Sequence, residues 1–186
     1  NLLDILKFPL AAPSANISSK LSPTSAKDVV DEFGNKIKFI LDGGQCQVGL
    51  ESTIIDLIGK PVVLRPGSIT VEKIQKILKK KIKIKKNLRR VSAPGQLKLH
   101  YSPGIPVKMN KKYAEKNQAL IGFGKKFKTG KNHFNLSKKG NLKEAANNLY
   151  KTMREIRKRN FKSIAVSKIP NTEIGYAIND RLKKAS

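Results

Sequence analysis

Apolar and polar residues follow two different periods along the chain, which predicts both helices and strands. The stretch TSAKDVVDEFG, residues 24–34, repeats apolar residues at helical spacing. Thr24 or Ser25 stands in the N-cap position, and Gly34 is placed to end the helix. The apolar face of this predicted helix consists of Val29, Val30 and Phe33.

Strand-like patterns follow this helix. Residues 36–42, KIKFILD, predict a strand that ends in the glycine-rich residues 43–51. Residues 52–58 and 61–67 are two further β-rich runs. They are separated by Gly59-Lys60, which favours a hairpin turn. Residues 1–8 look like the tail of an amphipathic helix, which suggests that part of the natural protein precedes them.

A helix is expected over residues 68–81, with lysines outward and an inward face of Ile74, Ile77 and Leu78. Residues 79–110 then have the composition of a linker. Three prolines exclude a long helix there: Pro94, Pro103 and Pro106. The linker is also too apolar to be freely solvated, so it is expected to lie across a surface; its apolar residues are Leu97, Leu99, Tyr101, Ile105 and Val107.

The last third of the chain alternates strands and helices. Strands are expected at residues 118–124, 132–137 and 162–169, and helices at 141–160 and 172–186. The longer helix has an Asn141 cap and an apolar stripe of Leu142, Ala145, Ala146, Leu149, Met153 and Ile156. This order of elements predicts a small parallel α/β unit.

The net charge of +26 is the strongest compositional signal. Such a charge is typical of nucleic-acid binding. However, 32 of the 39 basic residues are lysine and only seven are arginine, the residue suited to bidentate phosphate contacts. A solvated lysine surface therefore explains most of the charge, with weak RNA binding as a secondary consequence.

Several classes are disfavoured by what the sequence lacks. It contains no phosphate-loop, dinucleotide-binding or zinc-hydrolase motif. His100 and His133 are too isolated to suggest a metal pair, and Cys46 has no histidine nearby in the sequence. A single cysteine and the absence of an eighteen-residue apolar run favour a cytoplasmic protein without a membrane span.

Short polar motifs at strand ends are more informative in combination than singly. In chain order they are PLAAPSAN, SPT, DGG, GLESTIIDL, VLRPGSIT and APGQLKLHYSPGIPV, which together span residues 9–107, and AINDRLKKAS near the end. This series resembles the threonylcarbamoyl-AMP synthase family, in the form that has a YrdC-type catalytic domain and a C-terminal extension domain.

The resemblance implies an α/β architecture. Residues 1–85 would form the C-terminal half of a YrdC-like twisted-sheet catalytic domain, and residues 86–110 a proline-rich linker that acts as a lid. Residues 111–186 would form a small Rossmann-like extension domain.

The resemblance also implies a reaction, in which ATP, L-threonine and bicarbonate give threonylcarbamoyl-AMP and pyrophosphate. Mg²⁺ is implied by the triphosphate chemistry. The product would pass to downstream tRNA-modifying proteins for threonylcarbamoyladenosine formation. Because the family's lysine and arginine grip on ATP is missing before Asn1, this chain alone is expected to be inactive.

Six residues match positions that bind substrates in the family. The resemblance implies ATP contacts from Asn16, Thr24, Arg65 and Tyr101, and L-threonine contacts from Ser14 and Ser52. It assigns no catalytic residue and no metal ligand. The six residues are expected to converge around one adenylate, with Tyr101 folded over the nucleotide.

Each of these residues also has a purely structural interpretation. Ser14 and Thr24 suit turns and caps, and Asn16 suits a left-handed turn. Alternative roles are local hydrogen bonding for Ser52, pairing with Glu51 or Asp56 for Arg65, and packing for Tyr101.

Two rival functions stay open at this point. One is a basic RNA-binding module of the same fold that performs no chemistry. The other is a regulatory or interaction role for the C-terminal α/β unit.

Overall fold

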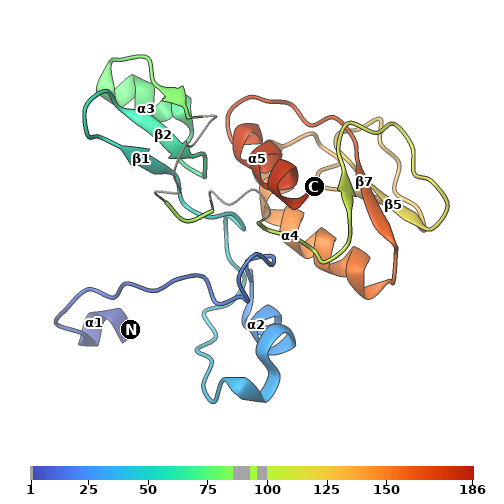
Figure 1. The fold of residues 1–186 in the computed structure, drawn as a ribbon, viewed down its shortest axis with the longest axis horizontal. Coiled ribbons are helices and arrows are strands. Elements are labelled where there is room, and N and C mark those ends of the chain that lie inside the picture. Colours follow the sequence, from blue (N-terminus) through green and yellow to red (C-terminus); the bar gives the residue numbers. More distant parts are fainter. Residues whose placement is uncertain (1, 86–92, 96–99) are drawn as a thin grey trace.

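The chain forms two α/β units, each built on its own sheet (Figure 1). The computed structural model describes residues 2–85, 93–95 and 100–186. The three-stranded sheet, in the order β1-β2-β3, belongs to the first half of the chain. The four-stranded sheet, in the order β4-β7-β5-β6, belongs to the second half. The α/β fold class predicted from the sequence is confirmed.

The smaller sheet begins with the predicted hairpin. Strands β1 (Ile54–Asp56) and β2 (Val62–Arg65) pair antiparallel, which confirms the turn expected at Gly59-Lys60. Helix α3 (Val71–Leu78) follows, and β3 (Lys83–Ile84) returns parallel to β2. The core of this unit is small because only three of the residues described in it are buried hydrophobics that pack together: Val63, Val71 and Ile82.

The inward face predicted for α3 was wrong. Ile77 and Leu78 of α3 are exposed, so only Val71 and the half-buried Ile74 face the sheet. The lysine-rich run at the start of the predicted linker also contributes to the fold. Ile82 is buried in the core, and the two residues after it form β3.

The N-terminal region contains α1 (Leu2–Ile5), α2 (Ala26–Phe33) and a 3₁₀ turn (Gly34–Lys36). Ser25 is the N-cap of α2 and accepts a hydrogen bond from the Asp28 amide. Gly34 ends the helix with a φ of 52°, a conformation that glycine adopts most easily. The start and stop predicted for this helix are therefore confirmed.

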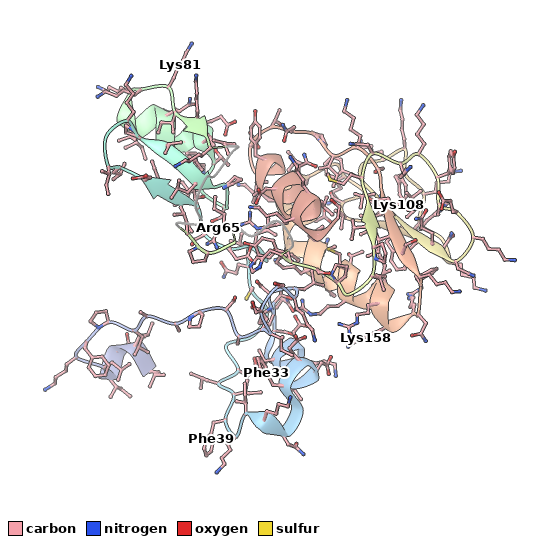
Figure 2. All side chains as sticks on the ribbon, in the orientation of Figure 1. Phe33, Phe39, Arg65, Lys81, Lys108 and Lys158 are labelled. Atoms are coloured by element: carbon pink, nitrogen blue, oxygen red, sulfur yellow. The ribbon has the colours of Figure 1, made fainter. Side chains whose placement is uncertain are left out.

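The strand predicted at residues 36–42 is absent, and this prediction was wrong. The chain has no regular secondary structure from Ile37 to Thr53. In this segment Phe39 is 89% exposed and Leu41 is 79% exposed. Figure 2 shows Phe39 pointing away from the rest of the molecule. A strand needs a neighbour that binds its backbone amide and carbonyl groups, and no described strand lies beside this segment.

The larger sheet has only parallel pairs among its described strands. Strand β7 (Ser163–Val166) lies between β4 (Val107–Lys108) and β5 (Gln118–Gly122), and β6 (His133–Asn135) forms the far edge. This confirms the predicted parallel unit. Strand β4 falls inside residues 86–110, the segment expected to be a linker, and pairs with β7.

Helices α4 (Leu142–Lys158) and α5 (Gly175–Ala185) lie together beside this sheet (Figure 1). Asn141 caps α4 as predicted, because its side chain accepts hydrogen bonds from the amides of Lys143 and Glu144. The predicted stripe of α4 is buried except for the half-buried Leu142. It packs on the strands together with Ile178 and Leu182 of α5.

Part of the predicted linker lies outside the described residues, namely 86–92 and 96–99, which include Leu97 and Leu99. The described residues that follow agree with the expectation that this segment lies on a surface. Tyr101 and Val107 are buried in the core of the larger unit, and Ile105 packs against it.

A substitution at a buried residue tests the position of the larger core. In the 186-residue chain, Leu149→Ala should lower the free energy of unfolding by about 2–5 kcal/mol, because Leu149 is fully buried and its loss leaves a cavity. Urea unfolding followed by helical circular dichroism measures the change.

The matched control is Leu41→Ala, the same chemical change at a side chain that is mostly exposed. It should stay within about 0.5 kcal/mol of the unchanged chain. Equal losses for the two variants would contradict the proposed position of the core.

Candidate functional site

The segment before β1 lies directly on α4. The Asn147 side-chain amide donates hydrogen bonds of 2.8 Å to the carbonyls of Cys46 and Gln47. Gly49 follows with a φ of 73°, and a Cβ there would lie 2.8 Å from the Asn147 backbone. Only glycine therefore allows this close approach. The two contacts fix the position of the next residues, which include Glu51 and Ser52.

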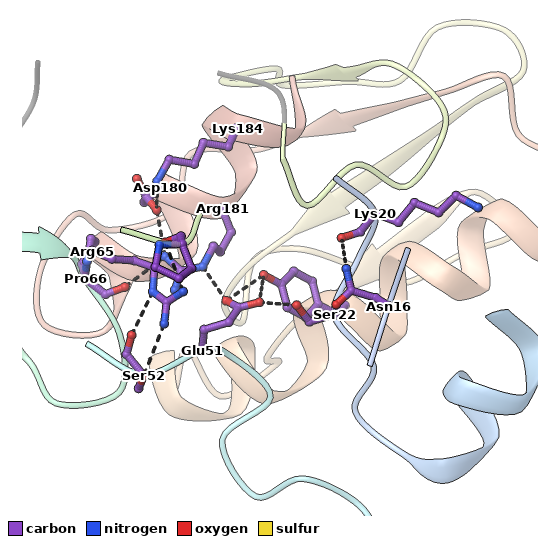
Figure 3. Close-up of polar contacts among 12 residues, drawn as sticks. Asn16, Lys20, Ser22, Glu51, Ser52, Arg65, Pro66, Asp180, Arg181 and Lys184 are labelled. Atoms are coloured by element: carbon purple, nitrogen blue, oxygen red, sulfur yellow. Dashed lines mark hydrogen bonds and ion pairs between the residues drawn. The ribbon is translucent and has the colours of Figure 1, made fainter. Parts of the chain in front are cut away.

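Glu51 joins the two units through a buried hydrogen-bond network (Figure 3). Its carboxylate accepts hydrogen bonds from the Ser22 hydroxyl at 2.5 Å and the Tyr150 hydroxyl at 3.1 Å. It also pairs with Arg181 of α5, whose Nε lies 2.7 Å from Glu51 Oε2. The Arg181 side chain is completely buried, so this ion pair is shielded from solvent.

Electrostatics keep both members of the pair charged. Burial alone raises the pKa of the Glu51 carboxyl, but the Arg181 charge and the hydrogen bonds from Ser22 and Arg181 more than offset this, so its pKa is lowered from 4.5. Burial lowers the pKa of the Arg181 guanidinium, but Glu51 reverses the effect and its pKa is raised. Burial and the Glu51 charge together raise the pKa of Tyr150 well above 10.0, so Tyr150 remains a hydrogen-bond donor.

Arg65, at the end of β2, is held against Ser52. Its Nε donates to the Ser52 carbonyl at 3.0 Å and its Nη2 to the Ser52 hydroxyl at 3.2 Å. Its Nη1 donates to the Pro94 carbonyl at 3.3 Å. The structure therefore brings together Arg65 and Ser52, two of the six residues expected to bind substrates. It does not support the alternative in which Arg65 pairs with Glu51, because Glu51 pairs with Arg181.

Tyr101 lies beside this pair. Its ring stacks on Tyr150 with centroids 6.0 Å apart, and the Arg181 guanidinium lies 4.9 Å from its centroid. Tyr101 has a φ of 59°, which is uncommon for a residue with a side chain. A Cβ on Gly95 would lie 2.0 Å from the Tyr101 hydroxyl oxygen, so the Pro94-Gly95 turn approaches the ring closely. Burial raises the pKa of Tyr101, against the opposing charge of Arg181.

A cavity of about 510 Å³ opens next to Glu51. Its polar lining comes from both units and includes the hydroxyls of Ser14, Ser22 and Tyr150. The remaining lining residues are Pro23, Cys46, Gln47, Val48, Gly49, Leu50 and Glu51. The cavity thus brings one expected threonine-binding residue, Ser14, close to the chain segment that carries the other, Ser52.

Asn16 and Thr24 lie apart from this arrangement. The Asn16 side-chain amide donates to the carbonyls of Ile17 and Lys20. The Thr24 hydroxyl donates to Asp28 at 2.9 Å, just before α2. Both side chains are used in local contacts, but Asn16 does not have the positive φ of the left-handed turn residue that its structural alternative expected. We expected Asn16, Ser52 and Arg65 to share one cavity, and the cavity beside Glu51 is lined by none of them.

Glu51, Tyr150 and Arg181 are three residues that the sequence analysis did not select. One signal was present for Arg181, which lies at helical spacing from Ile178 and directly before Leu182 on an otherwise apolar face. A charged residue at such a position is usually paired when it is buried. No such signal marks its partner, because Glu51 is 130 positions away.

Comparison with known proteins identifies the class. A family model described as "Threonylcarbamoyl-AMP synthase, C-terminal domain" matches residues 69–186, and one described as "Telomere recombination" matches residues 1–67. The two matches together cover both α/β units. The chain belongs to the threonylcarbamoyl-AMP synthase family, as the sequence motifs predicted.

Relatives of this chain support the same family assignment. The threonylcarbamoyl-AMP synthase of Pyrococcus abyssi is 35% identical over 204 residues, covering 100% of this chain and 60% of the relative. That of Bacillus subtilis is 31% identical over 202 residues, covering 96% and 57%. That of Schizosaccharomyces pombe is 42% identical over 125 residues, covering 61% and 30%. The chain thus spans about 60% of the length of the first two relatives.

A solved structure has the same fold. The crystal structure of Pyrococcus abyssi Sua5 complexed with L-threonine matches with a TM-score of 0.81 and 33% identity, over 94% of this chain and 56% of that one. A variant of the same protein, in which one histidine and one tyrosine are replaced by alanine, matches with a TM-score of 0.76 and 32% identity.

Neither a membrane span nor a metal site is found in the described ranges. No helix within residues 2–85 and 100–186 is long and apolar enough to cross a bilayer. Among the same residues, no three His, Cys, Asp or Glu side chains are grouped closely enough to hold a metal ion. Mg²⁺ therefore has no protein carboxylate cage among the described residues.

The Glu51–Arg181 pair predicts a specific pH dependence. Because the Glu51 pKa is lower in the folded chain than in the unfolded one, its contribution to stability is fully present above pH 4.5 and is lost as the pH falls through the lowered pKa. Glu51→Gln should cost about 3 kcal/mol at pH 7, because it removes one of the two carboxylates that pair with the buried Arg181 charge and leaves only Asp180. The cost should shrink in acid, where Glu51 itself becomes neutral.

Urea unfolding at a series of pH values from 7 to 3 measures this difference. The control is Glu72→Gln at an exposed position in the first turn of α3, which should change stability little at any pH. A constant difference between Glu51→Gln and the unchanged chain down to pH 3 would rule out the ionised pair.

Proposed function

We propose that the complete protein synthesises threonylcarbamoyl-AMP from ATP, L-threonine and bicarbonate, with release of pyrophosphate. The observation that carries this proposal is the match to the Pyrococcus abyssi synthase along the whole chain, at 35% identity. The solved structure of that protein is described as complexed with L-threonine, which supports L-threonine as a substrate here. The product serves tRNA threonylcarbamoyladenosine modification through downstream proteins, and the protein acts in the cytoplasm.

The residues expected to bind substrates have distinct parts in this proposal. Ser14 and Ser52 hold L-threonine by hydroxyl hydrogen bonds, and Arg65 binds a phosphate oxygen of ATP. The Arg65 bonds to Ser52 Oγ and to Pro94 are long, at 3.2 and 3.3 Å, so the stronger charge-assisted bond to phosphate competes well with them. Tyr101 covers the nucleotide and limits access of water to the adenylate.

Asn16 and Thr24 complete the ATP contacts in this proposal. Thr24 precedes the N-terminus of α2, an eight-residue helix whose free amides and dipole favour an anion. Its hydroxyl must then exchange its bond to Asp28 for one to the substrate. The Asn16 Oδ1 atom is buried with no hydrogen-bond partner, so it has unused capacity to accept a hydrogen bond.

The reaction requires positioning more than covalent chemistry. The amine of L-threonine first combines with bicarbonate to give a carbamate, with loss of water. An oxygen of the carbamate then attacks the α-phosphorus, and the bond from that phosphorus to the bridging oxygen breaks as pyrophosphate leaves in line with the attack. Mg²⁺, when bound, would neutralise charge on the triphosphate, and no described residue is assigned as its ligand.

The isolated 186-residue chain is inactive in this proposal. It matches only 60% of the length of the Pyrococcus abyssi relative. Many large apolar side chains of its first half are also exposed, which is typical of a surface that packs against further protein. They include Leu2, Leu3, Ile5, Phe8, Leu10, Phe39 and Leu41.

The proposal is tested with the polypeptide that the complete gene encodes. That protein should form pyrophosphate and threonylcarbamoyl-AMP from ATP, L-threonine and bicarbonate, and the 186-residue chain should form neither. Arg65→Ala in the complete protein should lower kcat/KM for ATP about 10- to 100-fold, through loss of a charge-assisted bond.

The matched control is Lys60→Ala, which removes a positive charge from the exposed hairpin turn before the same strand and should leave kcat/KM unchanged. The proposal is wrong if the complete protein makes no adenylate, or if the two substitutions have the same effect.

A second candidate function, RNA binding, is favoured by the distribution of charge in the larger unit. Residues 125–143 carry seven lysines and no acidic residue. All seven are exposed, and none forms an ion pair within the described part of the chain: Lys125, Lys126, Lys128, Lys131, Lys138, Lys139 and Lys143. Other lysines, such as Lys81 and Lys108, point outward from the two units (Figure 2).

RNA binding makes a separate prediction. Replacing Lys125, Lys126, Lys138 and Lys139 with glutamine should weaken tRNA binding. It should also reduce the slope of log K against log salt by about 0.7–0.9 for each phosphate that is no longer neutralised. Replacing Lys7, Lys27, Lys36 and Lys38, which are exposed in the N-terminal region, is the charge-matched control. Equal weakening by both sets would show attraction by net charge without a defined surface.

A further inference from the structure

Arg181 of the larger unit makes contacts that reach the neighbourhood of three expected substrate-binding residues. Its Nε pairs with Glu51, which precedes Ser52. Its Nη1 donates a 3.0 Å hydrogen bond to the carbonyl of Pro66, which follows Arg65. Its guanidinium lies over the ring of Tyr101 itself, 4.9 Å from the centroid.

These contacts converge from three separate segments of the chain. The turn before β1 and the end of β2 meet at a single guanidinium (Figure 3), and Tyr101 of the described part of the linker lies against the same group. A planar guanidinium suits this arrangement, because it donates several hydrogen bonds in fixed directions and also stacks on an aromatic ring. A lysine ammonium at the same place would not maintain all three contacts.

The position of Arg181 is itself fixed. Its Nη1 also lies 2.8 Å from Asp180 Oδ2, and Asp180 in turn pairs with Lys184 at 2.8 Å. All three residues belong to α5, which also packs in the core of the larger unit through Ile178 and Leu182. The guanidinium is therefore anchored to a rigid helix.

We propose that Arg181 is a positioning residue, through which the C-terminal unit holds Ser52, Arg65 and Tyr101 in their mutual arrangement. This inference rests on the proposed function for the roles of those three residues. The C-terminal unit then has a specific role, which is to assemble one side of the substrate site. The segments that carry Ser52, Arg65 and Tyr101 are not held together by the small core of the N-terminal unit.

Arg154 provides a matched control. It also reaches from the larger unit to the N-terminal region, where its Nη2 donates to the carbonyls of Leu21 and Ser22 at 2.8 and 2.9 Å. It pairs with Asp28 at 3.5 Å. It touches none of the residues next to Ser52 or Arg65, and it makes no described contact with Tyr101. Loss of Arg154 therefore removes an interface arginine and leaves the Arg181 contacts in place.

The first experiment measures amide hydrogen exchange in the 186-residue chain. Arg181→Lys should accelerate exchange about tenfold or more at residues 51–53 and at Arg65 and Gly67, and Arg154→Gln should not. Lysine keeps the charge beside Glu51, so Arg181→Lys is the variant most expected to fold. Unchanged exchange in both segments would overturn the proposal, whether or not the complete protein is an enzyme.

The second experiment separates positioning from stability. The double variant Arg181→Met/Glu51→Gln removes both charges, so it should be more stable than Glu51→Gln alone. In the complete protein, it should still raise KM for L-threonine and ATP about tenfold, with a smaller change in kcat. A double variant that recovers both stability and normal KM values would limit Arg181 to a role in stability.

The two experiments distinguish a failure of the proposed function from a failure of the role proposed for Arg181. If the complete protein forms no threonylcarbamoyl-AMP, the proposed function is wrong, and the exchange measurement still decides whether Arg181 orders the two segments. If the protein is active and Arg181→Lys has normal KM values and normal exchange, only the role of Arg181 is wrong.

Discussion

The ion pair between Glu51 and Arg181 is the contact on which the arrangement of the two units depends. Two charges taken out of water are stable only when hydrogen bonds satisfy their remaining atoms. Here Ser22 and Tyr150 donate to the carboxylate, and the guanidinium donates to Pro66 and Asp180. The network has members in the N-terminal region, in α4 and in α5. A loss at any one of them leaves a buried charge less well compensated.

Further polar contacts, beside the apolar packing of Leu21 and Leu50 on the core of the larger unit, help the interface to fix one relative position. Apolar surfaces can slide over one another at little cost, but hydrogen bonds to backbone carbonyls have defined directions. Asn147 binds the carbonyls of residues 46 and 47, and Arg154 binds those of residues 21 and 22. Helix α4 thus binds the backbone of two loops. The side chains of Leu21 and Ser22 make separate contacts, Leu21 in the core of the larger unit and Ser22 with Glu51.

The sequence alone was sufficient to predict the structural features that have local causes. The caps at Ser25 and Asn141, the stripe of α4 and the parallel order of the larger sheet all follow from spacing and turn residues. The strand expected at residues 36–42 failed because a strand depends on a neighbour, which local alternation does not reveal. The prediction that Ile77 and Leu78 face inward was wrong for a similar reason. Helical spacing does not say how much of a sheet is present to cover these side chains.

The candidate site was predictable only in part. Motif order was sufficient to select Ser52, Arg65 and Tyr101, which do lie together around Arg181. It did not indicate that Asn16 and Thr24 are engaged in local turns. It also did not reveal Glu51 and Tyr150, because their significance comes from contacts about 100 or more positions apart in the chain.

That sequence separation has a consequence for biosynthesis. Glu51 leaves the ribosome 130 residues before Arg181. At roughly 5–20 residues per second, the carboxylate waits on the order of 7–26 s for its counter-ion. During this interval it is hydrated and unpaired, and the turn that carries Ser52 has no anchor in α5. The grouping of Ser52, Arg65 and Tyr101 around Arg181 can therefore form only after translation has delivered α5, so a polypeptide that ends before α5 would lack this arrangement.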